Sequence, residues 1–311
     1  MELISPNINI DFVGRKTIAV MFSAALIVIG LVSLLIKGGP NYGIDFAGGT
    51  LVQVKFTQVT KAADIKDALQ SLELGSLVVQ QFGETADEFL IRAQNTSAEL
   101  EGLSKQIANA IESKYGVGSV EVRRAEMVGP QVGKDLREKG LMAILYAMIG
   151  ILVYVTWRFE FRFAVGAILA LVHDVLITLG AFSVFNQEID LPVIAAFLAI
   201  IGYSLNDTII VYDRIRENMG KHGKDGLVKV VNRSINETLS RTILTSGTTL
   251  LVVAALFVFG GGVIHTFAFA LLVGILIGTY SSIFVASPLL IFWEERKGGK
   301  GTKAVAKGGI A

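Results

Sequence analysis

The 311-residue chain has no cysteine, which excludes disulfide bonds and chemistry that depends on thiolates. Histidine is also scarce: the three histidines, His173, His222 and His265, lie far apart in the sequence and form no metal-binding motif. Neither sign of charge dominates, because 28 Lys and Arg are balanced by 27 Asp and Glu, so the composition gives no indication of nucleic-acid binding. We therefore expect no metal, no cofactor and no nucleic-acid partner.

Long apolar runs are what the chain has in abundance. Hydrophobic residues make up 52% of it and the mean hydropathy is +0.59, higher than soluble domains usually reach. A membrane-spanning helix needs about 20 mostly apolar residues. Six segments meet this requirement, at residues 17–36, 139–157, 161–185, 191–212, 240–260 and 263–293. The sequence therefore predicts a polytopic α-helical membrane protein with six transmembrane helices, five of them within residues 139–293.

The first apolar segment follows Arg15 and Lys16, as the apolar part of a signal peptide would. The apolar part of a signal peptide is about 7–15 residues long, and this one has about 20. No clear cleavage site of small residues follows it. We therefore interpret residues 17–36 as an uncleaved membrane anchor.

Lys and Arg are concentrated on one side of the predicted spans. They cluster at residues 15–16, 158–162, 214–241 and 296–307, whereas the turns at 186–190 and 260–264 contain none. Loops on the cytoplasmic side of a membrane carry an excess of Lys and Arg. The distribution therefore predicts that both termini are cytoplasmic. The predicted cytoplasmic parts are residues 1–16, the loop 213–239 with an interfacial helix, and the tail 294–311.

Residues 37–138 separate the first two spans and are predicted to lie outside the cytoplasm. About 100 residues are enough for a small domain with its own core. Apolar periodicity predicts the order strand, helix, strand, strand, helix, strand, at residues 50–56, 62–72, 76–82, 88–94, 96–116 and 119–128. This is the order of a ferredoxin-like α+β domain. The segment contains no metal-ligand spacing, nucleophile–base pair or phosphate loop, so we expect it to bind or couple rather than to catalyse a reaction.

Two glycine-containing motifs flank this domain. "GIDFAGGT" (43–50) is either a ligand-binding loop or a turn in which glycines permit positive φ, and the turn is favoured. "VGPQVGKDL" (128–136) leads into the second span. Pro130 and Gly133 suggest a stiff joint with one flexible point, and a plain linker fits the sequence equally well.

Ionisable residues interrupt three of the apolar spans. His173 and Asp174 lie near the middle of the third span, Asp207 lies inside the fourth, and Arg241 opens the fifth, followed by Thr245. A charged carboxylate at the bilayer centre costs on the order of 2.5–3.5 kcal/mol. These acids should therefore face the bundle interior, take up a proton or pair with a cation.

The fourth span has a narrow polar stripe, because Tyr203, Ser204 and Asp207 fall on one helix face. Burial favours the neutral form of a carboxyl, and a nearby guanidinium favours the charged form. An Asp207–Arg241 pair that approaches and separates would thus take up and release a proton.

Structural roles remain as alternatives for the same residues. Asp207 would then only hydrogen-bond to a neighbouring helix, His173 and Asp174 would only tie two helices together, and Arg241 would extend its side chain to the lipid headgroups. In the last span, Gly274 and Gly278 have the spacing that permits close helix contact. That span has about 30 residues, so we expect it to be tilted or broken near these glycines.

Together these motifs resemble the SecD/SecF family of bacterial protein-export membrane proteins. The resemblance rests on "GIDFAGGT" (43–50), "VGPQVG" (128–133), "LVHDV" (171–175), "GYSLNDTIIVYDRIREN" (202–218) and "TLSRTILTSGTT" (238–249). These motifs extend over nearly the whole chain in the order expected for the family. Six spans with one large outer domain after the first also fit.

The resemblance implies a function and a set of partners. Such a protein would pair with a SecD-like subunit in the bacterial cytoplasmic (inner) membrane, forming a body like that of resistance-nodulation-division transporters. It would use the proton gradient to promote preprotein translocation, with a SecYEG-type channel, the translocating preprotein and membrane lipid as further partners, and it would not be an enzyme. The proton-linked residues of the family match Asp207 and Arg241, with Thr245 nearby, and we add Asp174 to this predicted proton pathway.

Two other functions are compatible with parts of the sequence. A half-size proton-coupled exporter of small molecules would need a hydrophobic cleft for its substrate and usually a longer chain with two such halves. A purely structural assembly subunit would not need ionisable residues in the middle of its spans.

Overall fold

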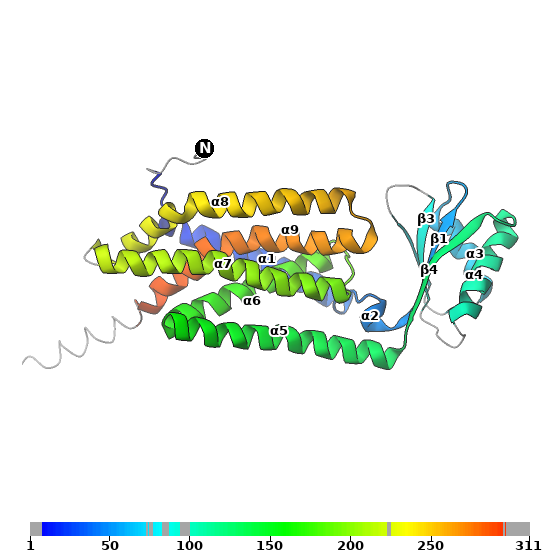
Figure 1. Cartoon of the computed structure of the whole chain (residues 1–311), viewed down its shortest axis with the longest axis horizontal. Helices are drawn as coiled ribbons and strands as arrows, with labels where there is room; N and C mark the ends of the chain where they lie inside the picture. The colour runs from blue at the N-terminus through cyan, green and yellow to red at the C-terminus, as the bar shows by residue number, and fades with distance from the viewer. Residues whose placement is uncertain are drawn as a thin grey trace, which may run out of the picture.

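The computed structural model describes residues 8–72, 74, 77–82, 87–93, 100–222, 225–294 and 296. The chain forms a bundle of long helices with a small α/β domain at one end (Figure 1). Six helical segments are long and apolar enough to cross a membrane, as the sequence predicts. The helices of the bundle are α1 (Lys16–Lys37), α5 (Pro130–Arg158), α6 (Phe161–Val184), α7 (Leu191–His222), α8 (Leu227–Phe259) and α9 (Gly262–Ser281). Of the predicted terminal segments, residues 1–7 and 297–311 lie outside the described residues.

Two of these helices are longer than the predicted spans. α7 continues to His222 and α8 begins at Leu227, so most of the segment 213–239, predicted to be a loop with an interfacial helix, consists of the ends of two long helices. Ion pairs at helical spacing stabilise the extension of α7: Glu217 contacts Arg214 at 2.8 Å and Lys221 at 2.6 Å.

The last span is not broken at its glycines. Helix α9 is followed by a π-helical turn, Ser282–Ala286, before the chain returns to α-helix. Pro288, just beyond this turn, has no N–H to donate and disturbs regular α-helical bonding. Gly274 lies against Ile200 of α7, and a Cβ on Gly278 would lie 2.9 Å from the Cβ of Ser204. The glycine spacing therefore brings α9 close to α7 of the same chain.

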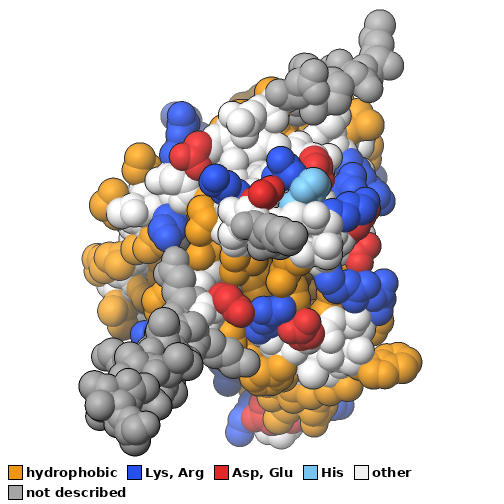
Figure 2. All heavy atoms as spheres, turned by 90° about the vertical axis from the view of Figure 1, so that its left-hand side faces the viewer, with side chains coloured by type: hydrophobic (Ala, Val, Ile, Leu, Met, Phe, Trp, Pro, Cys, Tyr) orange, Lys and Arg blue, Asp and Glu red, His pale blue; other side chains and the backbone are white. Residues whose placement is uncertain are grey.

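Charged side chains gather at the end of the bundle remote from the α/β domain, as Figure 2 shows. Several of them form ion pairs between helices, including Arg158 with Asp213 at 3.9 Å and Arg162 with Glu294 at 2.7 Å. This end of the molecule is therefore polar, in contrast to the helix surfaces between the two ends.

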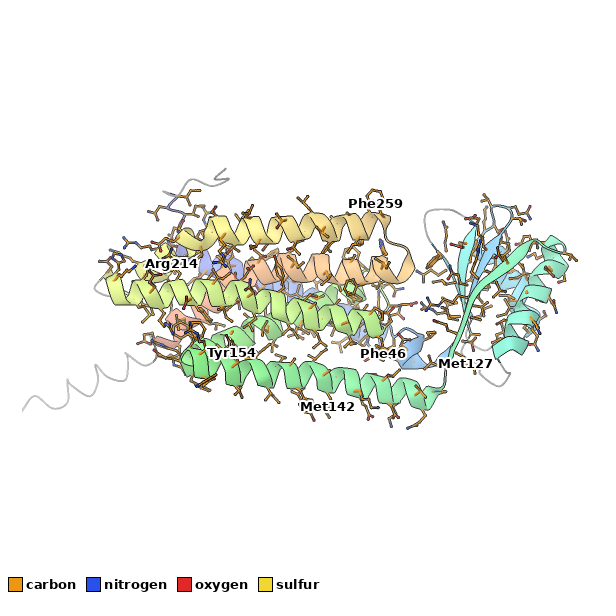
Figure 3. The ribbon with its side chains drawn as sticks, in the orientation of Figure 1. Phe46, Met127, Met142, Tyr154, Arg214 and Phe259 are labelled. Carbon is orange, nitrogen blue, oxygen red and sulfur yellow. The ribbon has the colours of Figure 1, made fainter. Side chains whose placement is uncertain are left out.

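The outer surfaces of α1 and α5, and that of residues 251–259 of α8, are apolar. In Figure 3, Met142 lies on the side of α5 away from the bundle, and Phe259 lies at the end of α8. The residue Phe259 is 86% exposed. Large exposed apolar surfaces of this kind are typical of membrane contact, and the buried side chains lie mainly on α6, α7 and α9.

The α/β domain contains a four-stranded sheet. Its elements are β1 (Gly49–Phe56), α3 (Ala62–Leu69), β2 (Leu77–Gln81), β3 (Glu88–Ala93), α4 (Leu100–Tyr115) and β4 (Val120–Val128). The strand order in the sheet is β2-β3-β1-β4, and each neighbouring pair is antiparallel. Both helices lie on the face of the sheet that is turned away from the bundle (Figure 1). The predicted order of strands and helices is thus present.

The core of this domain lies between the sheet and its two helices. Because side chains alternate along a strand, Val52, Val54 and Phe56 all point to one face of β1, where they pack with Ile65 of α3 and Ile107 of α4. Full burial of an apolar side chain of this size contributes about 1.5–3 kcal/mol. The domain therefore has its own core, separate from that of the bundle.

The two glycine motifs meet where the domain joins the bundle. The turn that follows α2 (Ile44–Ala47) has positive φ at Gly48 (76°) and Gly49 (124°), which confirms the predicted glycine turn. Only Gly129 separates β4 from α5, and Pro130 is the first residue of that helix. A Cβ on Gly133 would lie 3.0 Å from the carbonyl oxygen of Phe46. Residues 130–136 are therefore the first turns of α5, packed at Gly133 against α2, and not a plain linker.

Candidate functional site

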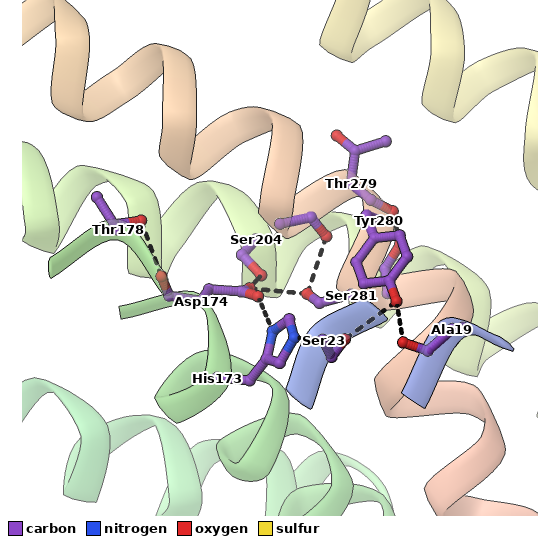
Figure 4. Close-up of polar contacts among 11 residues, drawn as sticks. Ala19, Ser23, His173, Asp174, Thr178, Ser204, Thr279, Tyr280 and Ser281 are labelled. Carbon is purple, nitrogen blue, oxygen red and sulfur yellow. Dashed lines mark hydrogen bonds and ion pairs between the residues drawn. The ribbon is translucent and has the colours of Figure 1, made fainter. Parts of the chain in front are cut away.

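Asp174 of α6 lies at the centre of a polar cluster inside the bundle (Figure 4). The residue is fully buried. Its Oδ1 is 2.8 Å from Nδ1 of His173, and its Oδ2 accepts hydrogen bonds from Ser204 of α7 at 2.6 Å and Ser281 of α9 at 2.7 Å. Both oxygens thus have short contacts, which offset the loss of hydration that burial imposes on a carboxyl.

The cluster continues to helix α1 through His173. Its Nε2 is 2.9 Å from Oγ of Ser23, which lies 3.0 Å from the hydroxyl of Tyr280. The Tyr280 hydroxyl donates to the carbonyl oxygen of Ala19 at 2.7 Å. Figure 4 shows these groups as a chain of contacts from α6 to α1. The polar side chains therefore fix α1, whose outer surface is exposed, against α6 and α9.

Asp207 of α7 is also fully buried, but its contacts are weaker. Its Oδ2 accepts from Ser246 of α8 at 3.2 Å and from Thr279 of α9 at 3.5 Å, and Thr279 also donates to Ser246 at 2.8 Å. Within the part of the chain that the structure describes, Oδ1 of Asp207 has no hydrogen-bond partner. This carboxyl is therefore incompletely bonded in a buried position.

Arg241 and Thr245 of α8 lie at the edge of this second cluster. The exposed guanidinium of Arg241 interacts electrostatically with Asp207, but no ion pair between them is found among the described residues. The Thr245 hydroxyl donates to backbone carbonyls of its own helix, at 2.9 Å to Arg241 and 3.1 Å to Thr242. Because α8 begins at Leu227, Arg241 lies inside a long helix rather than at its start.

The same two helices contact both acids. On α7, Ser204 bonds to Asp174, and Asp207 lies one turn further along the helix. On α9, Ser281 bonds to Asp174 and Thr279 bonds to Asp207. The polar interior therefore extends from α1 to α8, and carboxyl, imidazole and hydroxyl groups of this kind can hold and pass protons.

Several of these contacts were not expected from the sequence. The unexpected partners are Ser23, Ser246, Thr279, Tyr280 and Ser281. The polar run "GTYSS" (278–282) inside an apolar span was a signal for three of them. No pattern in the sequence pointed to Ser23 or Ser246, because single serines are common in membrane helices.

A third polar region lies where the α/β domain meets the bundle. Arg92 of β3 forms an ion pair with Glu188 of the α6–α7 connection, and Asp190 accepts a hydrogen bond from the backbone of Val193 at 3.1 Å. The pKa of Asp190 is raised to about 6, mainly by burial and also by the nearby charge of Asp45, while the Val193 hydrogen bond and the charge of Arg92 oppose the change. Burial also lowers the pKa of Arg92, against the effect of Asp190 and Asp45.

Comparison with known proteins gives matches over nearly the whole chain. The family model described as "Protein export membrane protein SecD/SecF, C-terminal" matches residues 107–296, and "SecD/SecF GG Motif" matches residues 32–58. The chain is 51% identical over 294 residues to a protein translocase subunit SecF of Desulfurispirillum indicum, covering 92% of each chain. It is 48% identical over 292 residues to that of Vibrio alginolyticus, covering 93% of this chain and 91% of the relative.

Solved structures agree with these relatives. The crystal structure of SecDF, a translocon-associated membrane protein from Thermus thermophilus, matches with a TM-score of 0.83 and 36% identity over 94% of this chain. A SecDF structure in a super-membrane-facing form matches with a TM-score of 0.70 over 98% of this chain. The chain spans 40% and 41% of these two solved chains. This protein is therefore a multi-pass membrane protein that belongs to the SecD/SecF family of protein-export membrane proteins.

Proposed function

We propose that this protein acts as the SecF-type subunit of a Sec protein translocase and uses the proton gradient to promote preprotein translocation. The observation that carries the proposal is the state of Asp207, fully buried with one oxygen that has no partner among the described residues. Such a carboxyl is costly to keep charged in a membrane, yet the charge of Arg241 partly offsets that cost. A movement of Arg241 toward or away from Asp207 would therefore change which protonation state of the carboxyl is favoured.

The proposed proton pathway contains Asp207, Arg241, Thr245 and Asp174. Asp207 is the proton carrier, and Arg241 stabilises its charged form. Thr245 is included because of the family resemblance and its place one turn from Arg241 on α8. Asp174 is included because α7 and α9 connect it to the Asp207 cluster.

A SecD-like subunit is the proposed partner within the membrane. Arg241 and Thr248 are exposed on α8 and Thr245 is half-buried beside them, so a polar stripe lies on the outer surface of a membrane helix. Polar groups are disfavoured against lipid, and a second membrane subunit would cover them. The solved SecDF chains, of which this chain spans about two fifths, support such a partner.

The other proposed partners are a SecYEG-type channel, the translocating preprotein and membrane lipid. The relatives are named as protein translocase subunits, and the matching solved protein is described as translocon-associated. The apolar outer surfaces of α1 and α5 suit contact with lipid. No enzymatic reaction is proposed.

We place the protein in the bacterial cytoplasmic membrane, with residues 37–138 outside the cytoplasm and both termini inside. The charged end of the bundle in Figure 2 supports this orientation, because positive residues favour the cytoplasmic side. We assign the outer domain to the ferredoxin-like class, and the antiparallel strand order β2-β3-β1-β4 supports this assignment. It would contact the emerging preprotein or the partner subunit.

The test is gradient-dependent preprotein release in vesicles that hold equal amounts of each variant, with and without an uncoupler. Asp207→Asn keeps the size of the side chain and removes its titration, so we expect it to lose gradient stimulation. Asp207→Glu still titrates and should keep part of it. Asp213→Asn, an exposed acid on the same helix, is the matched control and should behave as wild type. Normal stimulation in Asp207→Asn would contradict the proposed function.

A further inference from the structure

The hydrogen bonds around His173 determine which atoms donate. A tyrosine hydroxyl has one proton, and a backbone carbonyl can only accept. The Tyr280 proton is therefore directed at the Ala19 oxygen, 2.7 Å away. The contact of 3.0 Å between Tyr280 and Ser23 then requires Ser23 to donate to the tyrosine oxygen.

The same reasoning fixes the state of the imidazole. Because the single hydroxyl proton of Ser23 is used toward Tyr280, the contact of 2.9 Å with His173 requires Nε2 of the imidazole to donate. The Nδ1 atom then faces Oδ1 of Asp174 at 2.8 Å. That contact needs one proton, on Nδ1 as an imidazolium beside a carboxylate, or on Oδ1 as a carboxylic acid beside a neutral imidazole. In both forms the pair has no net charge.

We propose that His173 and Asp174 form a second proton site of the membrane body, which holds one shared proton and serves as a reservoir for Asp207. The shared proton follows from the hydrogen bonds alone, whereas the reservoir role rests on the proposed function. Groups from three neighbouring helices contact the site: Ser23 of α1, Ser204 of α7, and Tyr280 and Ser281 of α9 (Figure 4). The other ionisable groups near the pair are Tyr280 and, one turn beyond Ser204, Asp207.

The net charge of the His173–Asp174 pair explains why the pair holds one shared proton. Loss of the shared proton would leave a carboxylate against the imidazole lone pair, with a net negative charge inside the membrane. A second proton would give the pair a net positive charge. An unpaired charge near the bilayer centre is costly, so the pair resists both changes. The proton leaves only when the contacts to α7 and α9 change, which links its release to helix movement.

The first experiment observes the protons on His173 directly. The protein, labelled with nitrogen-15 histidine in lipid nanodiscs, is studied by NMR, and the His173 signals are assigned by their loss in His173→Gln. We expect Nε2 to be protonated and Nδ1 to share a proton with Asp174. In Asp174→Asn, Nδ1 is expected to become an unprotonated acceptor while Nε2 keeps its proton. A bare Nε2 in the wild-type protein, or an Nδ1 that holds a proton of its own in Asp174→Asn, would overturn the shared proton.

Two serines of α1 provide a matched pair of variants. Ser23 contacts His173, whereas Ser33 contacts Ser183, another residue of α6, at 2.7 Å. Both variants, Ser23→Ala and Ser33→Ala, remove one hydrogen bond between α1 and α6, and Ser23→Ala also removes the bond to Tyr280 of α9. We expect only Ser23→Ala to change the His173 signals. Equal changes in both variants would contradict a local effect on the imidazole.

The reservoir role is tested separately by gradient-dependent preprotein release. At equal protein amounts we expect the stimulation by the gradient to fall by more than half in Asp174→Asn and to be unchanged in Ser33→Ala. Normal stimulation in Asp174→Asn, together with the expected NMR result, would overturn the reservoir role and leave the proton site intact. Failure of the proposed function has a different outcome, because the wild-type protein itself would then show no gradient stimulation.

Discussion

Asp174 and Asp207 lie on adjacent helices and are both fully buried, but their surroundings differ. Asp174 has three short contacts, between 2.6 and 2.8 Å, that occupy both of its oxygens. Asp207 has two longer contacts, at 3.2 and 3.5 Å, on a single oxygen. A well-bonded carboxyl is held in one state by its donors, whereas a poorly bonded carboxyl can change its proton or its partner at little cost. We therefore assign storage of a proton to Asp174 and exchange to Asp207.

The two acids also differ in what lies beyond them. Asp174 contacts α7 and α9 directly and α1 through His173, so its carboxyl is surrounded by protein. Asp207 faces α8, whose outer surface carries the exposed Arg241. The exchanging acid is therefore the one nearer to the surface at which we propose a second subunit.

The largest expected effect on stability comes from replacing one of the two acids by alanine. Asp174→Ala leaves the imidazole of His173 and two serine hydroxyls without their acceptor, and breaking a buried pair typically costs roughly 3–5 kcal/mol. Asp207→Ala removes two weak hydrogen bonds and should cost about 1 kcal/mol. Thermal unfolding of the purified variants in detergent measures both. Equal losses of stability would remove the distinction between the two sites.

The next largest loss of stability is expected from a substitution that displaces Ser204, which donates a hydrogen bond to Asp174. A Cβ on Gly278 would meet Ser204, so Gly278→Ala should push that serine from Asp174 and destabilise the protein by roughly 1–3 kcal/mol. Gly202→Ala is the control, because a Cβ there has no neighbour within 4 Å and alanine favours a helix. The melting temperature should fall in the first variant and not in the second. A tolerated Gly278→Ala would mean that the α7–α9 contact is looser than the structure indicates.

A third acid, outside the membrane helices, adds a pH-dependent test. The pKa of Asp190 is raised from 3.8 to about 6 in the folded protein, so the folded state binds this proton more tightly than the unfolded state. Its contribution to stability is present below pH 3.8 and is lost as the pH rises through about 6. Asp190→Asn stays neutral and can still cap α7, so we expect a gain of about 3 kcal/mol well above pH 6 and none at low pH.

Melting temperatures of wild type and Asp190→Asn across this pH range provide the measurement for Asp190. Asp213→Asn, on the exposed side of α7, is a control for the loss of a charge. A difference between wild type and Asp190→Asn that does not vary with pH would show that the carboxyl acts through its hydrogen bond to Val193 and not through its proton.

The smallest effect on stability is expected at Thr245. Its hydroxyl donates to carbonyls of its own helix, so Thr245→Val should change stability by less than about 0.5 kcal/mol. Gradient-dependent release should nevertheless decrease if Thr245 belongs to the proton pathway. Unchanged release at an unchanged melting temperature would remove Thr245 from that pathway.

Much of the architecture could be predicted from local patterns. The apolar runs gave six spans, and alternation in the α/β domain gave the order of its strands and helices. The extension of α7 and the early start of α8 were not predicted, because both segments are too polar for a hydropathy pattern to register, and α7 is stabilised there by ion pairs at helical spacing. The spacing of Gly274 and Gly278 predicted a close helix contact but not its partner, because only the packing of the helices shows that Gly278 contacts Ser204 of the same chain.

The site was predicted less completely than the fold. Asp174 and Asp207 stand out because acids are rare in membrane spans. Their partners could not be predicted, because contacts such as His173 with Ser23 join residues far apart in the sequence and depend on helix packing. The position of Arg241 on the exposed side of α8 likewise depends on the rotation of that helix in the bundle.

The most direct test of the difference between the two acids follows their carboxyl groups by infrared spectroscopy. Difference spectra between acidic and alkaline pH are recorded for the protein in lipid vesicles, with Asp190→Asn as the background so that Asp190 does not contribute. We expect a carboxyl band that appears on acidification, is absent in Asp207→Asn and is retained in Asp174→Asn. A band that persists in Asp207→Asn and disappears in Asp174→Asn would reverse the two roles and contradict the account.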